Sequence, residues 1–124
     1  MSVGKTWEEE YGYSDALLSG DLLFISGQVG LEADGSVPTD PNRQYDLTFA
    51  TIGNLLAEHG ASAQDLVELV SFHIDYPQHM KEFMEAKARF QGTVRPAWTA
   101  VGVAALGKPG ILVEVKAIAR IRQA

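Results

Sequence analysis

An amphipathic helix with clear boundaries divides this chain and limits the folds that it can adopt. Asp40 is typical of a helix N-cap, Pro41 suits the first helical position, and Gly60 suits the left-handed residue that follows a helix end. Between these signals, apolar residues recur on one helical face: Tyr45, Phe49, Ile52, Leu55 and Leu56. We therefore predict a helix from Pro41 to His59 that packs one face against another layer.

Short apolar runs on both sides of this helix predict strands. Residues 16–18 and 21–26 are joined by Ser19-Gly20-Asp21, which is typical of a hairpin. From Leu66 to Tyr76 the chain alternates, with Val70, Phe72, Ile74 and Tyr76 set against Ser71, His73 and Asp75. This alternation predicts a strand with one face in the core and one polar face.

The rest of the chain predicts a second helix and two further strands. The helix is expected to begin at Pro77 and to end near Gln91, with an apolar stripe of Met80, Phe83, Met84 and Phe90. Strands are expected at 97–104 and 111–121. The order ββαβαββ predicts an α+β fold in which two helices cover one face of a four- to six-stranded sheet. At 124 residues, the chain is expected to form a single domain, 1–124.

The last two strands are expected to pair as a hairpin. Burying Thr99, Val101 and Val103 beneath the helices, together with the alternate residues of 113–119, would turn a mixed surface to the other side. That surface would hold Trp98, Ala100 and Gly102 beside Glu114 and Lys116. Its mixture of aromatic, small and charged side chains suits a subunit interface with a pocket, so we predict an oligomer.

Composition narrows the function. The chain has 10 Lys and Arg against 16 Asp and Glu, a net charge of −6, which disfavours a nucleic-acid partner. It contains no cysteine, so thiolate catalysis and disulfides are excluded. No apolar run approaches the ~18 residues of a membrane span, and the N-terminus lacks a secretory signal. We expect a cytoplasmic protein with no membrane partner.

Several motifs point only weakly to chemistry. Ser26-Gly27-Gln28-Val29-Gly30 follows a strand, but no helix begins after it and no Gly-Lys-Ser/Thr is present, so a phosphate loop is disfavoured. Three residues could by type be metal ligands: His73, Asp75 and His79. No further ligand spacing supports such a site, and we expect no metal. The simpler interpretation of His73 is a partly buried, hydrogen-bonded histidine.

Glu114 is the strongest candidate for a functional group. It interrupts the apolar strand Ile111-Leu112-Val113-Glu114-Val115, where a carboxylate is costly unless it is paired, placed at an interface or functional. Lys116 lies on the same strand face and offers an ion pair. A catalytic role and a structural pair both remain open.

Four segments together resemble the RidA (YjgF) family of reactive-intermediate deaminases. These segments are Ser26-Gly27-Gln28, the strand Val70 to Asp75, the run Pro96 to Val103, and the run Val113 to Ala119. Within the family, the chain most resembles the YjgH-like branch, on the runs Asp21 to Gly30, Ser71-Phe72-His73 and Trp98 to Val103. The resemblance implies a chorismate-mutase-like fold assembled as a homotrimer with ligand clefts between subunits. It also implies hydrolysis of enamines and imines to ammonia and keto acids without a cofactor.

Site residues follow from the same resemblance. Glu114 matches the glutamate that positions the attacking water, Tyr13 matches a pocket tyrosine, and Gly27 matches a pocket glycine. Trp98 stands in place of an arginine that clamps the substrate carboxylate. Ala100 stands in place of a cysteine, and Phe83 stands in place of an asparagine.

These departures predict a more apolar cleft. An indole has one donor and no charge, whereas a guanidinium makes two parallel hydrogen bonds to a carboxylate. We therefore expect ordinary 2-imino acids to be poor substrates. Whether Trp98 stacks on a ligand or packs at an interface remains open, and so does the reach of Arg95 to the cleft.

Three functions follow in order of preference. The first is a small-molecule enamine or imine hydrolase, and the alternative is a ligand-binding protein of the same fold without turnover. The third is an endoribonuclease, which the acidic charge disfavours.

Overall fold

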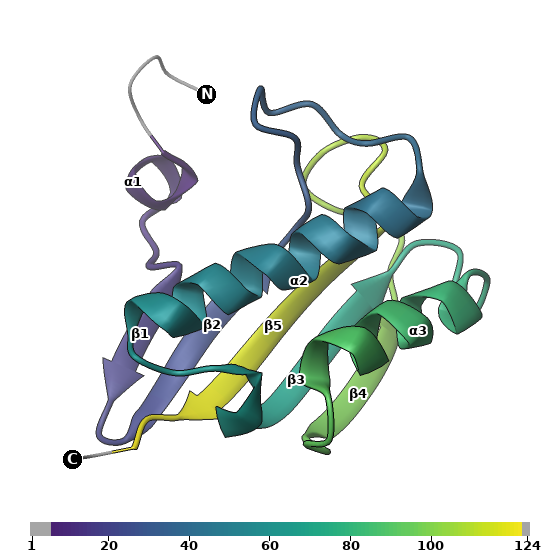
Figure 1. Ribbon diagram of the computed structural model, residues 1–124. Coiled ribbons are helices and arrows are strands. Elements are labelled where there is room, and N and C mark those ends of the chain that lie inside the picture. Colours follow the sequence, from purple (N-terminus) through teal and green to yellow (C-terminus); the bar gives the residue numbers. More distant parts are fainter. Residues whose placement is uncertain (1–5, 123–124) are drawn as a thin grey trace.

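The computed structural model describes residues 6–122 and consists of a five-stranded mixed sheet with its two long helices on one face (Figure 1). This confirms the α+β class and the order ββαβαββ of the main elements. No helix within 6–122 has the length and apolar character needed to cross a bilayer. In chain order the elements are α1 (Trp7–Tyr11), β1 (Ala16–Ser19), β2 (Leu22–Gln28), α2 (Pro41–Glu58), the 3-10 turn η1 (Ala63–Asp65), β3 (Leu66–His73), α3 (Met80–Gln91), β4 (Ala97–Gly102) and β5 (Val113–Arg120).

Strand β5 occupies the centre of the sheet. The strand order is β1-β2-β5-β3-β4, with β5 antiparallel to both neighbours and β4 parallel to β3 at one edge. The expected hairpin between the last two strands was therefore wrong. Parallel strands need a crossover connection of a dozen or more residues, and α3 supplies one between β3 and β4. With β4 taken to the edge, the position between β2 and β3 is filled by β5.

The predicted helix α2 forms as the sequence indicated. Asp40 accepts a hydrogen bond from the backbone N–H of Asn42 at 3.1 Å, Pro41 is the first helical residue, and Gly60 is left-handed with φ of 72°. Its apolar stripe is buried against the sheet, where it meets the alternate residues of β5 that were expected to face the helices: Val113, Val115, Ala117 and Ala119.

Helix α3 begins later than the sequence predicted. It starts at Met80 rather than at Pro77, since Asp75 and His79 adopt φ of 56° and 67° in the turn before it. Left-handed residues cannot continue a right-handed helix, so the turn delays the helix start. Phe83 then points into the core.

The two faces of β3 are the reverse of the predicted ones. Leu69, Ser71 and His73 are buried beneath the helices, while Val70 and Phe72 lie on the other face. The register sets this arrangement, because Ser71 and His73 lie opposite the buried residues of β5. Their polar atoms are hydrogen-bonded to one another, which makes their burial tolerable.

Strand β4 is reversed for the same reason. Trp98 lies opposite Leu69 and Ala100 opposite Ser71, so both turn toward the helices. Thr99 and Val101 lie on the other face and are exposed. The prediction that Thr99 and Val101 would be covered was wrong.

The uncovered side of the sheet is called the open face below. No described helix covers it, since α2 and α3 lie together on the opposite side (Figure 1). It exposes large apolar side chains from several strands, among them Leu17 at 59%, Phe24 at 41% and Val101 at 37%. An apolar surface of this kind is typical of an interface.

A buried glutamine fixes the start of the central strand. The Gln44 side chain donates to the carbonyls of Pro38 and Gly110, at 2.9 and 2.8 Å. Its oxygen accepts the backbone N–H of Leu112 at 2.9 Å. These bonds attach the segment that enters β5 to the first turn of α2. They thereby fix where Glu114, two residues after Leu112, lies along the central strand.

Candidate active site

Glu114 lies on the open face, near the start of β5 and opposite Phe72. It is half-buried, and this burial raises the pKa of its carboxyl group above the usual value. The described residues form four ion pairs, and none of them includes Glu114 or Lys116. The structural pair that the sequence left open is therefore not formed in this chain.

Gly27 lies directly beside the Glu114 carboxyl group. A Cβ atom at position 27 would stand 2.7 Å from Cδ of Glu114, so any side chain there would force the Glu114 carboxyl group out of its present position. The register of β2 against β5 shifts between Ile25 and Gln28, which marks a bulge around Gly27. The glycine thus lets the bulge approach the carboxylate, which explains why this position suits glycine.

The segment before β1 is fastened to this bulge. Ser26 Oγ donates to the carbonyl of Ser14 at 2.6 Å, and the backbone N–H of Ser26 donates to the carbonyl of Asp15 at 2.9 Å. The side chain of Gln28 donates to Asp15 Oδ1 at 3.2 Å. These bonds bring Tyr13, the residue before Ser14, to the neighbourhood of Gly27.

A cavity of about 250 Å³ lies beside the bulge. Tyr13 and Gly27 line it together with Asp15 and Gln28, and Trp7 of α1 forms part of its wall. The pKa of the Tyr13 hydroxyl is raised, first by burial and then by the charges of Asp15, Glu8 and Glu114. Tyr13, Gly27 and Glu114, which the sequence placed in one pocket, therefore lie in one region of the molecule.

Helix α1 was missed at the sequence level. Residues 8–10 are an acidic run, and such a run by itself predicts only a solvated surface segment. In the structure Thr6 and Glu9 form a capping box, and Glu8 accepts the backbone N–H of Asp15 at 2.7 Å. The spacing Thr-x-x-Glu is a readable signal for a helix start and could have revealed this element.

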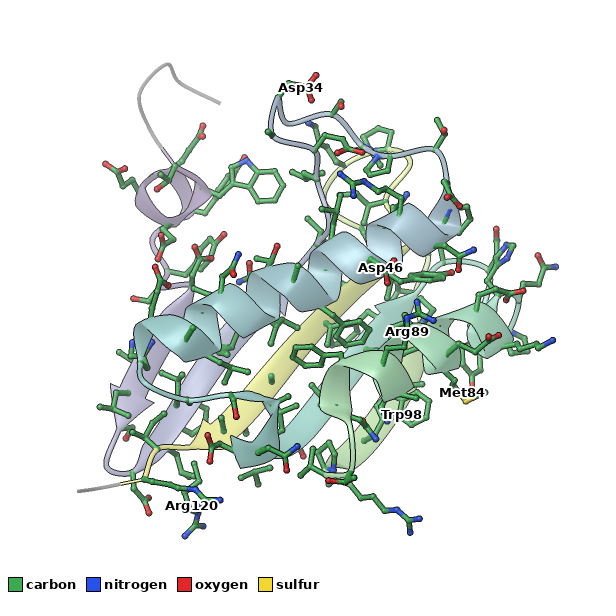
Figure 2. All side chains as sticks on the ribbon, in the orientation of Figure 1. Asp34, Asp46, Met84, Arg89, Trp98 and Arg120 are labelled. Atoms are coloured by element: carbon green, nitrogen blue, oxygen red, sulfur yellow. The ribbon has the colours of Figure 1, made fainter. Side chains whose placement is uncertain are left out.

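A second group of functional candidates lies beneath α3. Trp98 Nε1 donates to Ser71 Oγ at 2.9 Å, and Ser71 Oγ lies 2.8 Å from His73 Nε2 (Figure 2 labels Trp98 beside α3). Burial lowers the pKa of His73 and favours its neutral form. The Ser71 hydroxyl can thus accept from Trp98 and donate to neutral His73, which confirms the hydrogen-bonded interpretation of this histidine.

Phe83 and Ala100 lie beside this group. Phe83 is only 1% exposed, and its ring centroid lies 4.6 Å from that of His73 and 6.2 Å from that of Trp98. In the single chain Phe83 is a core residue that supports Trp98, so the expectation that it lines a ligand surface needs correction. Ala100 is half-buried opposite Ser71.

Glu114 and Trp98 lie on opposite faces of the sheet. The sequence had placed them on one mixed surface, but the parallel register of β4 turns Trp98 toward the helices while Glu114 stays on the open face. The structure therefore brings together Tyr13, Gly27 and Glu114 in one region, and Trp98, Ala100 and Phe83 in another. A single chain does not join the two regions.

The structure does not bring the three candidate metal ligands together. His73 is buried, whereas Asp75 and His79 are exposed in the turn before α3. Within residues 6–122, no three histidine, aspartate or glutamate side chains are grouped in a way that could hold a metal ion.

Two cations are close to Trp98, Arg95 in the sequence and Lys87 in space. Arg95 is exposed in the segment that leads to β4. The ammonium group of Lys87, on α3, lies over the Trp98 ring, 4.4 Å from its centroid. No pattern in the sequence indicates this position of Lys87, because a contact between a helix and the strand that follows it depends on the tertiary packing.

Comparison with known proteins identifies the family. Residues 5–121 match the family model described as endoribonuclease L-PSP. The chain is 42% identical to the RutC family protein YjgH of Escherichia coli over 90% of its length and 85% of the relative. It is 32% identical to protein HMF1 of Saccharomyces cerevisiae, over 89% and 84%.

Solved structures agree with the sequence matches. A structure of protein YjgH superposes with a TM-score of 0.84 at 39% identity, covering 96% of this chain and 91% of the other. A YjgF/YER057c/UK114 family member from Mycobacterium tuberculosis also gives 0.84, at 31% identity, with coverage of 97% and 96%. RidA from an Antarctic Psychrobacter gives 0.82 at 27% identity, with coverage of 98% and 92%.

The chain is thus an α+β protein with a half-buried carboxylate on an uncovered sheet face. It belongs to the RidA/YjgF family, the family of the endoribonuclease L-PSP model. The resemblance to the YjgH-like branch is confirmed by the match to YjgH.

Replacing Ser71 by alanine should destabilise the protein. The change leaves the Trp98 N–H and His73 Nε2 without their shared partner, which costs about 1–3 kcal/mol when such groups are buried. Urea denaturation at one fixed protein concentration measures the loss. Thr93→Ala is the matched control, since Thr93 is exposed in the turn before β4, away from the open face, and its change should stay within about 0.5 kcal/mol. Equal effects of the two changes would show that the hydrogen bonds of Ser71 contribute nothing.

Proposed function

We propose that the protein hydrolyses small enamines and imines in clefts between the subunits of a homotrimer, with Glu114 as the general base. The observation that carries this proposal is the half-buried Glu114 carboxyl beside Gly27 and the Tyr13 cavity. Burial raises the pKa of the Glu114 carboxyl, which makes its carboxylate a stronger base than an exposed one and suits it to taking and returning a proton. Membership of the RidA/YjgF family supports the same reaction class.

The reaction requires only water as co-reactant. An enamine first takes a proton on carbon and becomes the iminium. The oxygen of a water molecule then attacks the iminium carbon, and the π electrons of the C=N bond move to nitrogen while Glu114 accepts a proton from the water. The carboxyl returns this proton to the amine nitrogen. Collapse of the carbinolamine then breaks the C–N bond, releases ammonia and leaves a carbonyl product. The hydroxyl proton is lost to water in this step and balances the proton that the enamine carbon took up at the start.

The two separated groups of candidates support an intersubunit cleft. Glu114 and Trp98 lie on opposite faces of the sheet in one chain, so a cleft that contains both must combine two chains. The apolar side chains of the open face provide a surface that such an assembly would cover. In this cleft Tyr13 and Gly27 would line one side, with Trp98 and Ala100 on the other and Phe83 behind Trp98.

The protein should be a trimer in solution. Light scattering coupled to size exclusion is expected to give about three times the 13.5 kDa chain mass. Leu17→Lys places a charge on the exposed apolar part of the open face and should weaken the assembly, whereas Leu18→Lys, on the other face of the same strand, should weaken it less. A native protein that remains monomeric at micromolar concentration would remove the proposed cleft.

Glu114→Gln should abolish hydrolysis and preserve the fold. An amide cannot accept the proton from water, so we expect a loss of at least about a hundred-fold in ammonia release from freshly generated imines. The native rate should fall on acidification through a pKa above the usual glutamate value of 4.5, because the base must be ionised. Glu68→Gln is the control and should keep activity. Glu68 also lies on the open face, but on β3, opposite Ile118 rather than beside Gly27.

The stability of Glu114→Gln provides a second readout. The raised pKa means that the folded chain favours the protonated carboxyl, so native stability is lost as pH rises through the raised pKa. Glutamine removes this penalty. The variant should therefore be at least as stable as the native protein at neutral pH, and the difference should vanish in acid. Activity that survives in a destabilised variant would assign Glu114 a structural role.

Ordinary 2-imino acids should be poor substrates. The Trp98 N–H is already donated to Ser71, so the indole cannot replace the two hydrogen bonds of an arginine. Losing a charge-assisted contact of 1.5 to 3 kcal/mol corresponds to roughly ten- to a hundred-fold in kcat/KM. Ammonia release from 2-aminoacrylate, compared with an arginine-containing relative at matched trimer content, measures the difference. Equal rates would show that position 98 does not control substrate choice.

Ligand binding without turnover is the alternative function. The hydrogen bond from Trp98 to Ser71 supports this alternative, because an indole whose N–H is already used cannot orient a ligand, and a poorly oriented ligand reacts slowly. Binding of imines with no ammonia release would favour it. An endoribonuclease remains disfavoured by the net charge of −6, which repels RNA.

A further inference from the structure

Lys87 occupies an unusual position for a lysine. Its ammonium group lies over the Trp98 ring, 4.4 Å from the centroid, and the residue is half-buried against the sheet edge. Burial lowers the pKa of this amine, which means that part of its hydration has been lost. A cation on an aromatic face is stabilised by the ring quadrupole, but only by about 0.5–2 kcal/mol.

No carboxylate neutralises Lys87 within residues 6–122. The described ion pairs all use arginine, namely Arg43, Arg89, Arg120 and Arg122. Arg89, two residues further along α3, is paired with Asp46 at 3.0 Å. Lys87 thus differs from Arg89, because its ammonium group lies over an aromatic ring and has no acidic partner among the described ion pairs.

The ring that holds Lys87 is itself fixed. Trp98 Nε1 donates to Ser71, and the ring of Phe83 lies 6.2 Å away, centroid to centroid. The indole therefore acts as a rigid platform whose only donor is already used. The ammonium group of Lys87, which lies over this ring, can still donate a hydrogen bond to a ligand.

We propose that Lys87 is the anion-binding residue of the cleft and that a small carboxylate binds to its ammonium group beside Trp98. This inference rests on the proposed function for the location of the cleft. The surroundings favour a singly charged ligand, because a single ammonium group lies on the face of the Trp98 ring and is half-buried there. A phosphate would bring more charge than one lysine neutralises.

The proposal agrees with weak turnover of ordinary 2-imino acids. An ammonium group is a point charge on a flexible stem, whereas an arginine fork holds a carboxylate in one plane. Lys87 can therefore supply affinity for a carboxylate without fixing its orientation. Affinity and turnover should separate, with Lys87 acting mainly on binding.

Binding of pyruvate to the intact protein tests this inference without any turnover. The chain has two tryptophans, so the indole N–H of Trp98 gives one of two signals in a ¹⁵N–¹H correlation spectrum, and Trp7→Phe assigns it. Pyruvate should shift this signal in a saturable manner, and the uncharged pyruvamide should not. Lys87→Met should weaken pyruvate binding by about ten-fold or more, the size expected for a charge-assisted contact.

Two further variants control for structural effects. Lys81→Met removes an exposed lysine from the same helix and should leave pyruvate binding within about two-fold, as expected for a distant surface charge. Lys87→Arg keeps the cation and should retain binding. If Lys87→Met loses the fold or the trimer, Lys87→Gln replaces it, because glutamine keeps part of the aliphatic stem.

The outcomes separate this inference from the proposed function. Pyruvate binding that depends on Lys87, in a protein that hydrolyses no imine, supports the inference and overturns the enzymatic proposal. If the protein hydrolyses imines but its Trp98 signal does not shift on addition of pyruvate, the inference is overturned and the enzymatic proposal stands. Equal binding of pyruvate by native protein and Lys87→Met also overturns it. Where 2-aminoacrylate is hydrolysed, Lys87→Met should raise KM by a similar factor and leave kcat largely unchanged.

Discussion

The buried side chain of Gln44 is the interaction on which the position of Glu114 depends. Its three hydrogen bonds reach Pro38, Gly110 and Leu112, which belong to two segments that are far apart in the sequence. Hydrogen bonds of this kind are strong in a dry interior and costly to leave unmade. They hold the entry to β5 against the first turn of α2. Since β5 is the central strand, its register then sets which of its residues face the helices and which face outward.

That register divides the chemistry of the chain between two surfaces. The Glu114 side chain lies on the open face beside Gly27, whereas the Trp98 side chain lies beneath α3 and is hydrogen-bonded to Ser71. A helix-covered face normally carries apolar residues, and here it carries a polar cluster that is satisfied internally. The open face has the reverse character, with large apolar residues in an exposed position. The first departure includes Trp98, which we place in the proposed cleft, and the second provides the surface that the proposed assembly would cover.

Local signals in the sequence predicted the elements well and their partners poorly. Helix α2 could be predicted because its cap, its proline and its apolar stripe all lie within the helix itself. Glu114 could be found because a carboxylate in an apolar strand is conspicuous. The pairing of β4 could not be predicted, because a parallel partner depends on the path that α3 takes between the two strands. The inward position of Ser71 could not be predicted either, because its partner Trp98 is distant in the sequence and only the fold brings the two together.

The placement of Glu114 and Trp98 on opposite faces has a genetic consequence. In a cyclic trimer with clefts between neighbours, each chain would give its carboxylate to one cleft and its indole to another. A chain damaged only at Glu114 and a chain damaged only at Trp98 would each be inactive when alone. Mixed in one ring, in either ratio, they would restore a single cleft with both sides intact. Two defective alleles would then complement one another, and partial activity would return without any repaired copy.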